Sequence, residues 1–127
     1  MAVGVISNTA GEILVSRRAP GTHLAGLWEF PGGKVEATET AKAALYRELE
    51  EELGIQVVDA CALMRVRHRY AEKTVLLDTW RVLSYRGEPH GCEGQPLCWL
   101  AADALAAADF PAADRPIIDY LCERMLA

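Results

Sequence analysis

One segment of the chain combines two adjacent glycines, a helical pattern and six glutamates within residues 32–55. The pattern predicts a helix over residues 40–53, with Gly54 well placed as the residue just past its end. Three leucines spaced four residues apart form one apolar stripe at about 100° per residue: Leu45, Leu49 and Leu53. Because this stripe must pack against the rest of the protein, the direction of every glutamate on the helix can be predicted.

The stripe turns some of these glutamates inward. Glu52 projects towards the stripe and Glu48 lies at its edge, whereas Glu50 faces water on the opposite side. A carboxylate turned towards the core is costly unless a cation or several donors compensate it. Spacings of three and four residues let Glu48, Glu51 and Glu52 share ions. We therefore expect a site for Mg²⁺ or Mn²⁺ here, the alternative being an unusually placed network of salt bridges.

Three neighbouring residues could support such a site. Arg47 can pair with Glu51 one turn further along and hold that carboxylate in orientation. Gly32 and Gly33 have no Cβ atom, so the backbone can turn sharply there and approach an ion or a phosphate closely. A backbone carbonyl of either glycine would add a neutral oxygen ligand.

Composition excludes some classes of function. The net charge of −5 argues against binding nucleic acid through a broad basic surface. The four cysteines lack the paired spacing of a zinc site and are expected to be small hydrophobic residues in a reducing compartment. The first residues lack the pattern of a secretion signal, and no run approaches the roughly 20 apolar residues of a membrane span. We expect a soluble, cytoplasmic, monomeric protein with no membrane or nucleic-acid partner.

The remaining sequence predicts strands with helices set between them. The predicted strands are residues 2–7, 12–18, 27–30, 55–70, 73–87 and 97–100. The first two are expected to form a hairpin, and the two long ones an antiparallel pair. A weak helical stretch covers residues 101–108, and an amphipathic helix closes the chain from residue 114. This order predicts a single α+β layered domain over residues 1–127.

The glycine and glutamate segment resembles the Nudix box. The matching residues are Gly33, Glu39, Arg47, Glu48, Leu49, Glu51, Glu52, Gly54 and Ile55. Residues 28–34, 87–96 and 109–118 also resemble the MutT branch of that family, so the similarity covers essentially the whole chain. It implies a mixed β-sheet sandwiched between helices (an α/β/α sandwich). It also implies Mg²⁺-dependent hydrolysis of a nucleoside triphosphate to the monophosphate and pyrophosphate, with Mn²⁺ as a substitute.

The resemblance assigns roles in the metal site. Glu52 corresponds to the central ligand, Glu48 and Glu51 share the cluster, and a carbonyl of Gly32 or Gly33 completes it. Glu93 corresponds to a glutamate that returns to the metals from a distant loop. Glu48 is the expected general base, with Glu93 or Glu51 as the alternative.

The resemblance also assigns residues to the substrate. Arg18 and His23 correspond to residues that contact the phosphates and the sugar. Four consecutive residues are expected to line the nucleotide cleft: Glu29, Phe30, Pro31 and Gly32. Glu72 corresponds to an acidic residue near the base, although a solvated turn residue is an equally good interpretation.

Two departures bear on the base. Asp114 stands where the MutT pattern has an asparagine that reads oxidised guanine, and it could equally cap the last helix. The chain also has fewer residues ahead of its first strand than that pattern, so either the base pocket is more open or Val3 and Val5 help to line it.

Three functions follow from these observations. The MutT resemblance implies hydrolysis of 8-oxo-dGTP, which keeps damaged nucleotides out of DNA and avoids mutation. Residues 28–36 and 47–55 also resemble CTP or 5-methyl-dCTP pyrophosphohydrolases, and a carboxylate suits the cytosine amino group. A non-catalytic Nudix domain used as a sensor would usually lack some glutamates of the box, and all are present here.

Overall fold

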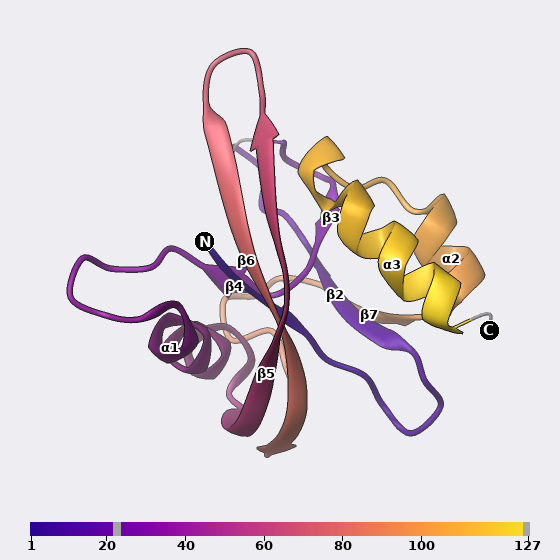
Figure 1. Cartoon of the computed structure of the whole chain (residues 1–127). Helices are drawn as coiled ribbons and strands as arrows, with labels where there is room; N and C mark the ends of the chain where they lie inside the picture. The colour runs from indigo at the N-terminus through magenta and orange to yellow at the C-terminus, as the bar shows by residue number, and fades with distance from the viewer. Residues whose placement is uncertain (22–23, 126–127) are drawn as a thin grey trace.

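The computed structural model describes residues 1–21 and 24–125. Its strands are β1 (Ala2–Val5), β2 (Ile13–Arg17), β3 (Trp28–Glu29), β4 (Gly32–Gly33), β5 (Gln56–Arg69), β6 (Thr74–Arg86) and β7 (Leu97–Leu100). Its helices are α1 (Ala41–Leu53), α2 (Ala102–Ala107), the short 3₁₀ turn η1 (Ala112–Asp114) and α3 (Arg115–Met125). Helix α1 lies on one side of the strands, and α2 and α3 lie on the other (Figure 1). The predicted α+β sandwich is confirmed.

The strands form two sheets rather than one. Four strands pair in the order β4-β1-β6-β5, with β1 parallel to β6 and the other pairs antiparallel. Three strands form an antiparallel sheet in the order β3-β2-β7. The first sheet is therefore mixed, as predicted, and the second continues the central layer between the helices.

The predicted hairpin of residues 2–7 and 12–18 is wrong beyond its turn. A bridge between Ser7 and Ile13 and a hydrogen bond from Leu14 N–H to Ile6 O (2.9 Å) join the two segments only near the turn. Beyond it, β1 and β2 enter different sheets. All four residues of β1 are buried, which is typical of a strand covered on both faces. A two-stranded hairpin could not supply that cover.

Each side of the sheets has its own apolar core. On one side the α1 stripe of Leu45, Leu49 and Leu53 is fully buried, as the spacing predicts. On the other side α3 buries Ile117 and Ile118 in the second apolar core.

None of the helices in the described part of the chain has the length and apolar character needed to cross a bilayer.

Helix α1 begins and ends where the sequence predicts. The Thr40 side chain accepts a hydrogen bond from Ala43 N–H at 3.1 Å, which satisfies a donor of the first turn. Gly54 has a left-handed φ of 68°, and its N–H donates to Glu50 O at 2.9 Å. The caps fix where α1 begins and ends, and its buried leucine stripe sets the direction of its glutamates.

Strands β5 and β6 form a long hairpin whose end projects beyond the helices (Figure 1). Its turn is closed by a hydrogen bond from Tyr70 N–H to Lys73 O at 2.8 Å. The projecting end packs beside η1, so it helps to build a cavity between the hairpin and the start of α3.

Candidate active site

The glutamates of α1 point as the helical pattern predicts. Glu48 and Glu52 are half-buried, whereas Glu50 and Glu51 are exposed. The side chain of Glu48 is 17% exposed and that of Glu51 is 56% exposed, so these two carboxylates differ in their access to water. The inward pair therefore consists of Glu48 and Glu52.

A cleft of about 830 Å³ brings carboxylates together from three parts of the chain. Glu29 comes from β3, Glu52 from α1 and Glu93 from the loop before β7. Arg17 and Arg18 lie at the end of β2 on the same cleft. An open cleft with acidic and basic walls suits a polyanionic ligand that arrives with cations.

The carboxyl group of Glu52 has the most perturbed acidity in this cleft. Burial raises its pKa to about 8, with further contributions from the negative charges of Glu29, Glu48 and Glu93. A hydrogen bond from the backbone of Gly32 acts in the opposite direction. Three nearby carboxylates thus add to the rise in the pKa of Glu52, and a cation bound there would stabilise its charged form.

The two glycines of β4 allow this close packing. A Cβ atom on Gly33 would collide with the carboxylate of Glu48, and one on Gly32 would collide with the backbone oxygen of Ala2. Gly33 thus leaves room for a functional side chain, whereas Gly32 leaves room for the neighbouring strand.

Arg47 holds the acidic cluster from its outer side. Its guanidinium binds both carboxylate oxygens of Glu39, at 3.1 and 2.6 Å, and Glu48 at 2.8 Å. It also donates to Lys34 O at 3.0 Å, while Glu51 lies at 3.4 Å. These carboxylates raise the pKa of Arg47, and Arg47 lowers that of Glu39. The predicted Glu51 partner is therefore secondary to Glu39 and Glu48.

The loop that carries Glu93 is tied directly to the backbone of Glu52. The N–H of Cys92 and the Nε2 of Gln95 each donate to Glu52 O at 3.0 Å. The Gln95 side chain also accepts from Glu93 N–H at 2.9 Å. Gln95 was missed by the sequence analysis, because a single glutamine in a loop has no periodic signal.

The residues of this cleft fit a divalent metal ion by their chemistry. Carboxylate oxygens are the ligands preferred by Mg²⁺ and Mn²⁺. The negative charges of Glu48 and of Glu93 both raise the pKa of Glu52, so a cation near Glu52 would be attracted by all three. Within the described residues, no three acidic, histidine or cysteine side chains already lie at coordinating distances from one point. Like charges repel, so carboxylates are expected to close to such distances only around a cation.

A second, apolar cavity of about 90 Å³ continues from the acidic cleft. Arg18 and Glu29 line both cavities and form an ion pair with each other. The remaining lining residues are Met1, Val3, Leu24, Phe30, Tyr70, Lys73, Val75, Leu77, Pro111, Ala113 and Asp114. The ring of Phe30 packs on that of Phe110 with centroids 5.2 Å apart. The Arg18–Glu29 pair thus separates a charged compartment from an apolar one.

Asp114 is the buried acid of the apolar cavity. It is 7% exposed, and burial raises its pKa to about 7, with Glu29 adding to the rise and Arg18 opposing it. Its carboxyl group makes no hydrogen bond to another residue of the described ranges 1–21 and 24–125. A side chain that caps α3 would make such a bond, so the geometry favours a role in the cavity.

Other predicted residues differ in their placement. His23 lies outside the described residues. Glu72 is exposed, and its neighbours Tyr70 and Lys73 line the apolar cavity instead. Pro31 accepts a hydrogen bond from Gly4 N–H at 2.8 Å and so ties the cleft to β1 rather than lining it. Of the two valines considered as possible lining of the base pocket, Val3 lines the apolar cavity and Val5 lines a separate groove.

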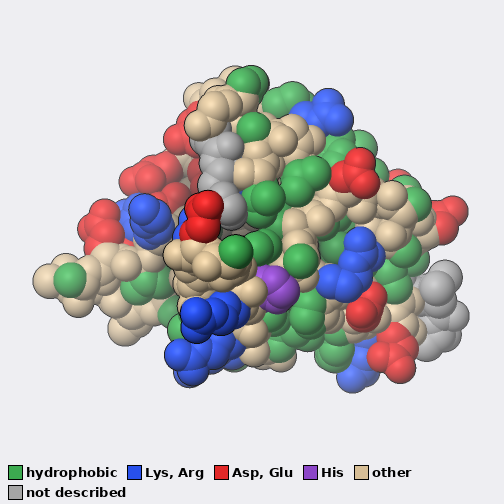
Figure 2. Space-filling view, turned by 90° about the horizontal axis from the view of Figure 1, so that it is seen from above, with side chains coloured by type: hydrophobic (Ala, Val, Ile, Leu, Met, Phe, Trp, Pro, Cys, Tyr) green, Lys and Arg blue, Asp and Glu red, His purple; other side chains and the backbone are tan. Residues whose placement is uncertain are grey.

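Basic and acidic side chains both occur on the face of the molecule seen from above. Figure 2 shows a group of Lys and Arg side chains at the lower edge of this face, further ones elsewhere on it, and Asp and Glu side chains on both its left and its right. The net charge of −5 therefore leaves local basic regions on the surface.

The chain is similar to known proteins over nearly its whole length. A family model described as a NUDIX domain matches residues 2–120. An 8-oxo-dGTP diphosphatase from Escherichia coli K12 is 42% identical over 121 residues, which cover 95% of this chain and 94% of the relative. A CTP pyrophosphohydrolase from the same organism is 33% identical over 117 residues, which cover 92% and 87%. A solved structure from work on MutT of Aliivibrio salmonicida and Vibrio cholerae superposes with a TM-score of 0.83 at 36% identity, covering 97% of this chain and 95% of that one. The chain belongs to the Nudix family.

Proposed function

We propose that this protein is a metal-dependent nucleoside triphosphate pyrophosphohydrolase that converts 8-oxo-dGTP to 8-oxo-dGMP and pyrophosphate. The observation that carries the proposal is a pair of cavities that share Arg18 and Glu29, one with carboxylates and the other apolar with buried Asp114. The 8-oxo-dGTP diphosphatase of Escherichia coli matches nearly the full length of the chain, which supports the same substrate. Such an activity would remove oxidised nucleotides before they enter DNA.

The acidic cleft would hold the triphosphate. Glu48, Glu51, Glu52 and Glu93 would bind Mg²⁺, which Mn²⁺ would replace, with a carbonyl of Gly32 or Gly33 as a further ligand. When bound, divalent cations offset the charge of the triphosphate, polarise the attacked phosphorus and lower the pKa of water.

The chain's own groups then direct the hydrolysis. Arg18, at the boundary between the two compartments, would contact the phosphates. Water would attack the β-phosphorus and the bond from that phosphorus to the oxygen that bridges it to the α-phosphorus would break, so that the nucleoside monophosphate leaves and the water oxygen stays in the pyrophosphate. Glu48 would accept the proton of this water, and Arg47 would hold the Glu48 carboxylate in orientation. Glu93 and Glu51 are the alternative bases.

Asp114 would read the base. 8-Oxoguanine carries a hydrogen on N7 beside the acceptor O6, whereas guanine has a bare N7. An ionised aspartate can accept from N7–H, and a protonated one can also donate to O6. A pKa of about 7 gives Asp114 access to both forms near neutral pH. The ionised form would repel the bare N7 of guanine, so discrimination should depend on the protonation of Asp114.

The test is kcat/KM across a panel of 8-oxo-dGTP, dGTP, CTP, 5-methyl-dCTP and ADP-ribose, each with Mg²⁺, with Mn²⁺ and with a chelator. A preference for 8-oxo-dGTP that requires metal supports the proposal. Absence of metal-dependent hydrolysis of every compound in the panel would support instead a non-catalytic Nudix domain.

A cytidine nucleotide is the second candidate substrate. The observation in its favour is the CTP pyrophosphohydrolase relative at 33% identity, together with a carboxylate in the base pocket that suits an exocyclic amino group. Asp114→Asn separates the two candidates. It should preserve or improve kcat/KM for 8-oxo-dGTP, whereas it should lower activity on CTP by removing a charge-assisted bond.

We further propose that the chain works as a single-domain monomer in the cytoplasm. The family model spans residues 2–120, which supports one domain. Light scattering of the purified protein tests the monomer, and a dimeric mass would refute it.

A further inference from the structure

One polar contact joins the end of the β5–β6 hairpin to the turn that carries Asp114. The hydroxyl oxygen of Tyr70 accepts a hydrogen bond from the backbone N–H of Ala113 at 3.1 Å. The two residues are 43 positions apart in the chain, and both line the apolar cavity. Ala113 directly precedes Asp114, so the contact acts on the backbone next to the buried acid.

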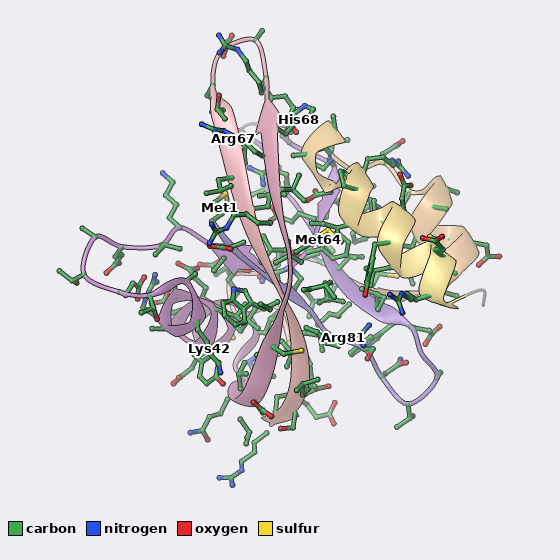
Figure 3. The ribbon with its side chains drawn as sticks, in the orientation of Figure 1. Met1, Lys42, Met64, Arg67, His68 and Arg81 are labelled. Carbon is green, nitrogen blue, oxygen red and sulfur yellow. The ribbon has the colours of Figure 1, made fainter. Side chains whose placement is uncertain are left out.

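Tyr70 is held firmly on the hairpin side. Its backbone N–H closes the β5–β6 turn by donating to Lys73 O. Its ring meets that of His68 edge to face, with centroids 4.6 Å apart. Figure 3 shows His68 and Arg67 on opposite sides of β5 near its end, with His68 on the side of α3. Strand alternation therefore directs His68 and Tyr70 towards η1.

The Tyr70 hydroxyl supplies an acceptor that the η1 turn lacks for the N–H of Ala113. Ala113 is only 3% exposed and lies in η1, where the first N–H groups of a helical turn lack an acceptor within the turn. Asp114 N–H is satisfied by Pro111 O at 3.0 Å. The hydroxyl of Tyr70 satisfies Ala113, and losing it would leave a buried donor near the cavity without that acceptor.

We propose that Tyr70 is a positioning residue for base recognition, because its hydroxyl holds the 111–114 turn so that Asp114 faces the base. The inference rests on the proposed function and adds a residue to it. Phenylalanine would fill the same space in the cavity but could not accept from Ala113. The change therefore removes the hydrogen bond and keeps the apolar wall.

The test compares Tyr70→Phe with wild type on 8-oxo-dGTP and dGTP. The ratio of kcat/KM for the two nucleotides should fall by about tenfold through a higher KM for 8-oxo-dGTP, with kcat unchanged, because one buried donor loses its partner. Tyr46→Phe is the matched control. It deletes a hydroxyl that donates to Val58 O at 3.5 Å, away from both cavities.

Two further measurements separate positioning from a general loss of structure. In an Asp114→Ala background, Tyr70→Phe should no longer change the ratio, because the hydroxyl acts through Asp114. Amide hydrogen exchange at Ala113 should quicken in Tyr70→Phe, while amides of α1 stay as protected as in wild type. An unchanged ratio, an equal loss of kcat on both nucleotides, or an additive effect in the Asp114→Ala background would each overturn the proposal.

The outcomes also distinguish this inference from the proposed function. A wild-type enzyme with no preference for 8-oxo-dGTP would refute the proposed substrate whatever Tyr70 does, and it would refute a role of Tyr70 in reading that base as well. With the preference present, the variant and the exchange at Ala113 decide the role of Tyr70 alone.

Discussion

Replacing Asp114 by asparagine should make the stability of the protein less dependent on pH. The two side chains have nearly the same shape, but only aspartate titrates. In the folded protein, burial raises the pKa of Asp114 from 3.8 to about 7. The folded state therefore binds this proton more tightly than the unfolded state does. The contribution of the group to stability is fully present below pH 3.8 and is lost as the pH rises towards about 7.

The size of the effect follows from the shift. Each pKa unit corresponds to about 1.4 kcal/mol, so the two units between pH 5 and pH 7 correspond to roughly 2–3 kcal/mol. As the pH rises from 5 to 8, the unfolding free energy of Asp114→Asn should therefore increase relative to that of wild type by about that amount. Above pH 8 the difference should change little. Any fixed cost of burying an amide adds equally at every pH and cancels from this difference.

Urea unfolding of both proteins at several pH values between 5 and 8, at constant ionic strength and with a chelator present, measures the difference. The other titrating groups, including Glu52, are the same in both proteins, so their contributions cancel when the two unfolding free energies are subtracted. A parallel assay should show that base discrimination by wild type varies with pH near neutrality and that discrimination by the variant does not. A difference in unfolding free energy that stays constant from pH 5 to pH 8 would mean that Asp114 titrates as an ordinary surface acid.

Three further predictions concern the acidic cleft. Glu52→Gln should lower kcat by several orders of magnitude with little effect on folding, because it removes a charged ligand worth several kcal/mol. Glu50→Gln, on the exposed face of the helix, should leave kcat nearly unchanged. Steady-state kinetics would contradict this if Glu52→Gln stayed within about tenfold of wild type. Glu93→Ala should raise the metal concentration needed for activity and leave the Tm without metal unchanged, and equal metal titrations of variant and wild type would make Glu93 a surface charge. Gly33→Ala should displace the Glu48 carboxylate and lower kcat more than Tm, since its Cβ atom collides with a side chain rather than with the backbone; full activity would show that the position of Glu48 is not critical.

Elements with a clear period could be predicted from the sequence. The apolar stripe of α1 fixed the inward direction of Glu48 and Glu52 and the outward direction of Glu50, because a helix with one buried face has a single rotation. The long β5–β6 pair followed in the same way from two β-rich runs around a short turn. Local patterns of this kind depend on few distant contacts.

Contacts between distant segments could not be predicted in the same way. Arg47 had Glu51 as a neighbour on its own helix, but the loop before α1 brings Glu39 closer, and no helical spacing encodes that loop. Nor did any pattern link Gln95 to the backbone of Glu52, or Tyr70 to Ala113. The hairpin error has the same origin, since β1 pairs with β4 and with β6, both of which lie further along the chain than β2.

The acidic cleft and the apolar cavity each hold one carboxyl group with a strongly raised pKa, Glu52 in the first and Asp114 in the second. Burial is the largest cause of the raised pKa of both groups. Around Glu52 the negative charges of Glu29, Glu48 and Glu93 raise the pKa further, so in the proposed function a cation that enters with the triphosphate would compensate its charge. Asp114 has Arg18 nearby, which lowers its pKa, and in the proposed function it would keep or release its proton near pH 7 as the base requires. Glu29 raises the pKa of both groups and pairs with Arg18 at the boundary between them. In the proposed function, a phosphate that draws Arg18 away from Glu29 would therefore change the charge near Asp114 and with it the pKa of Asp114.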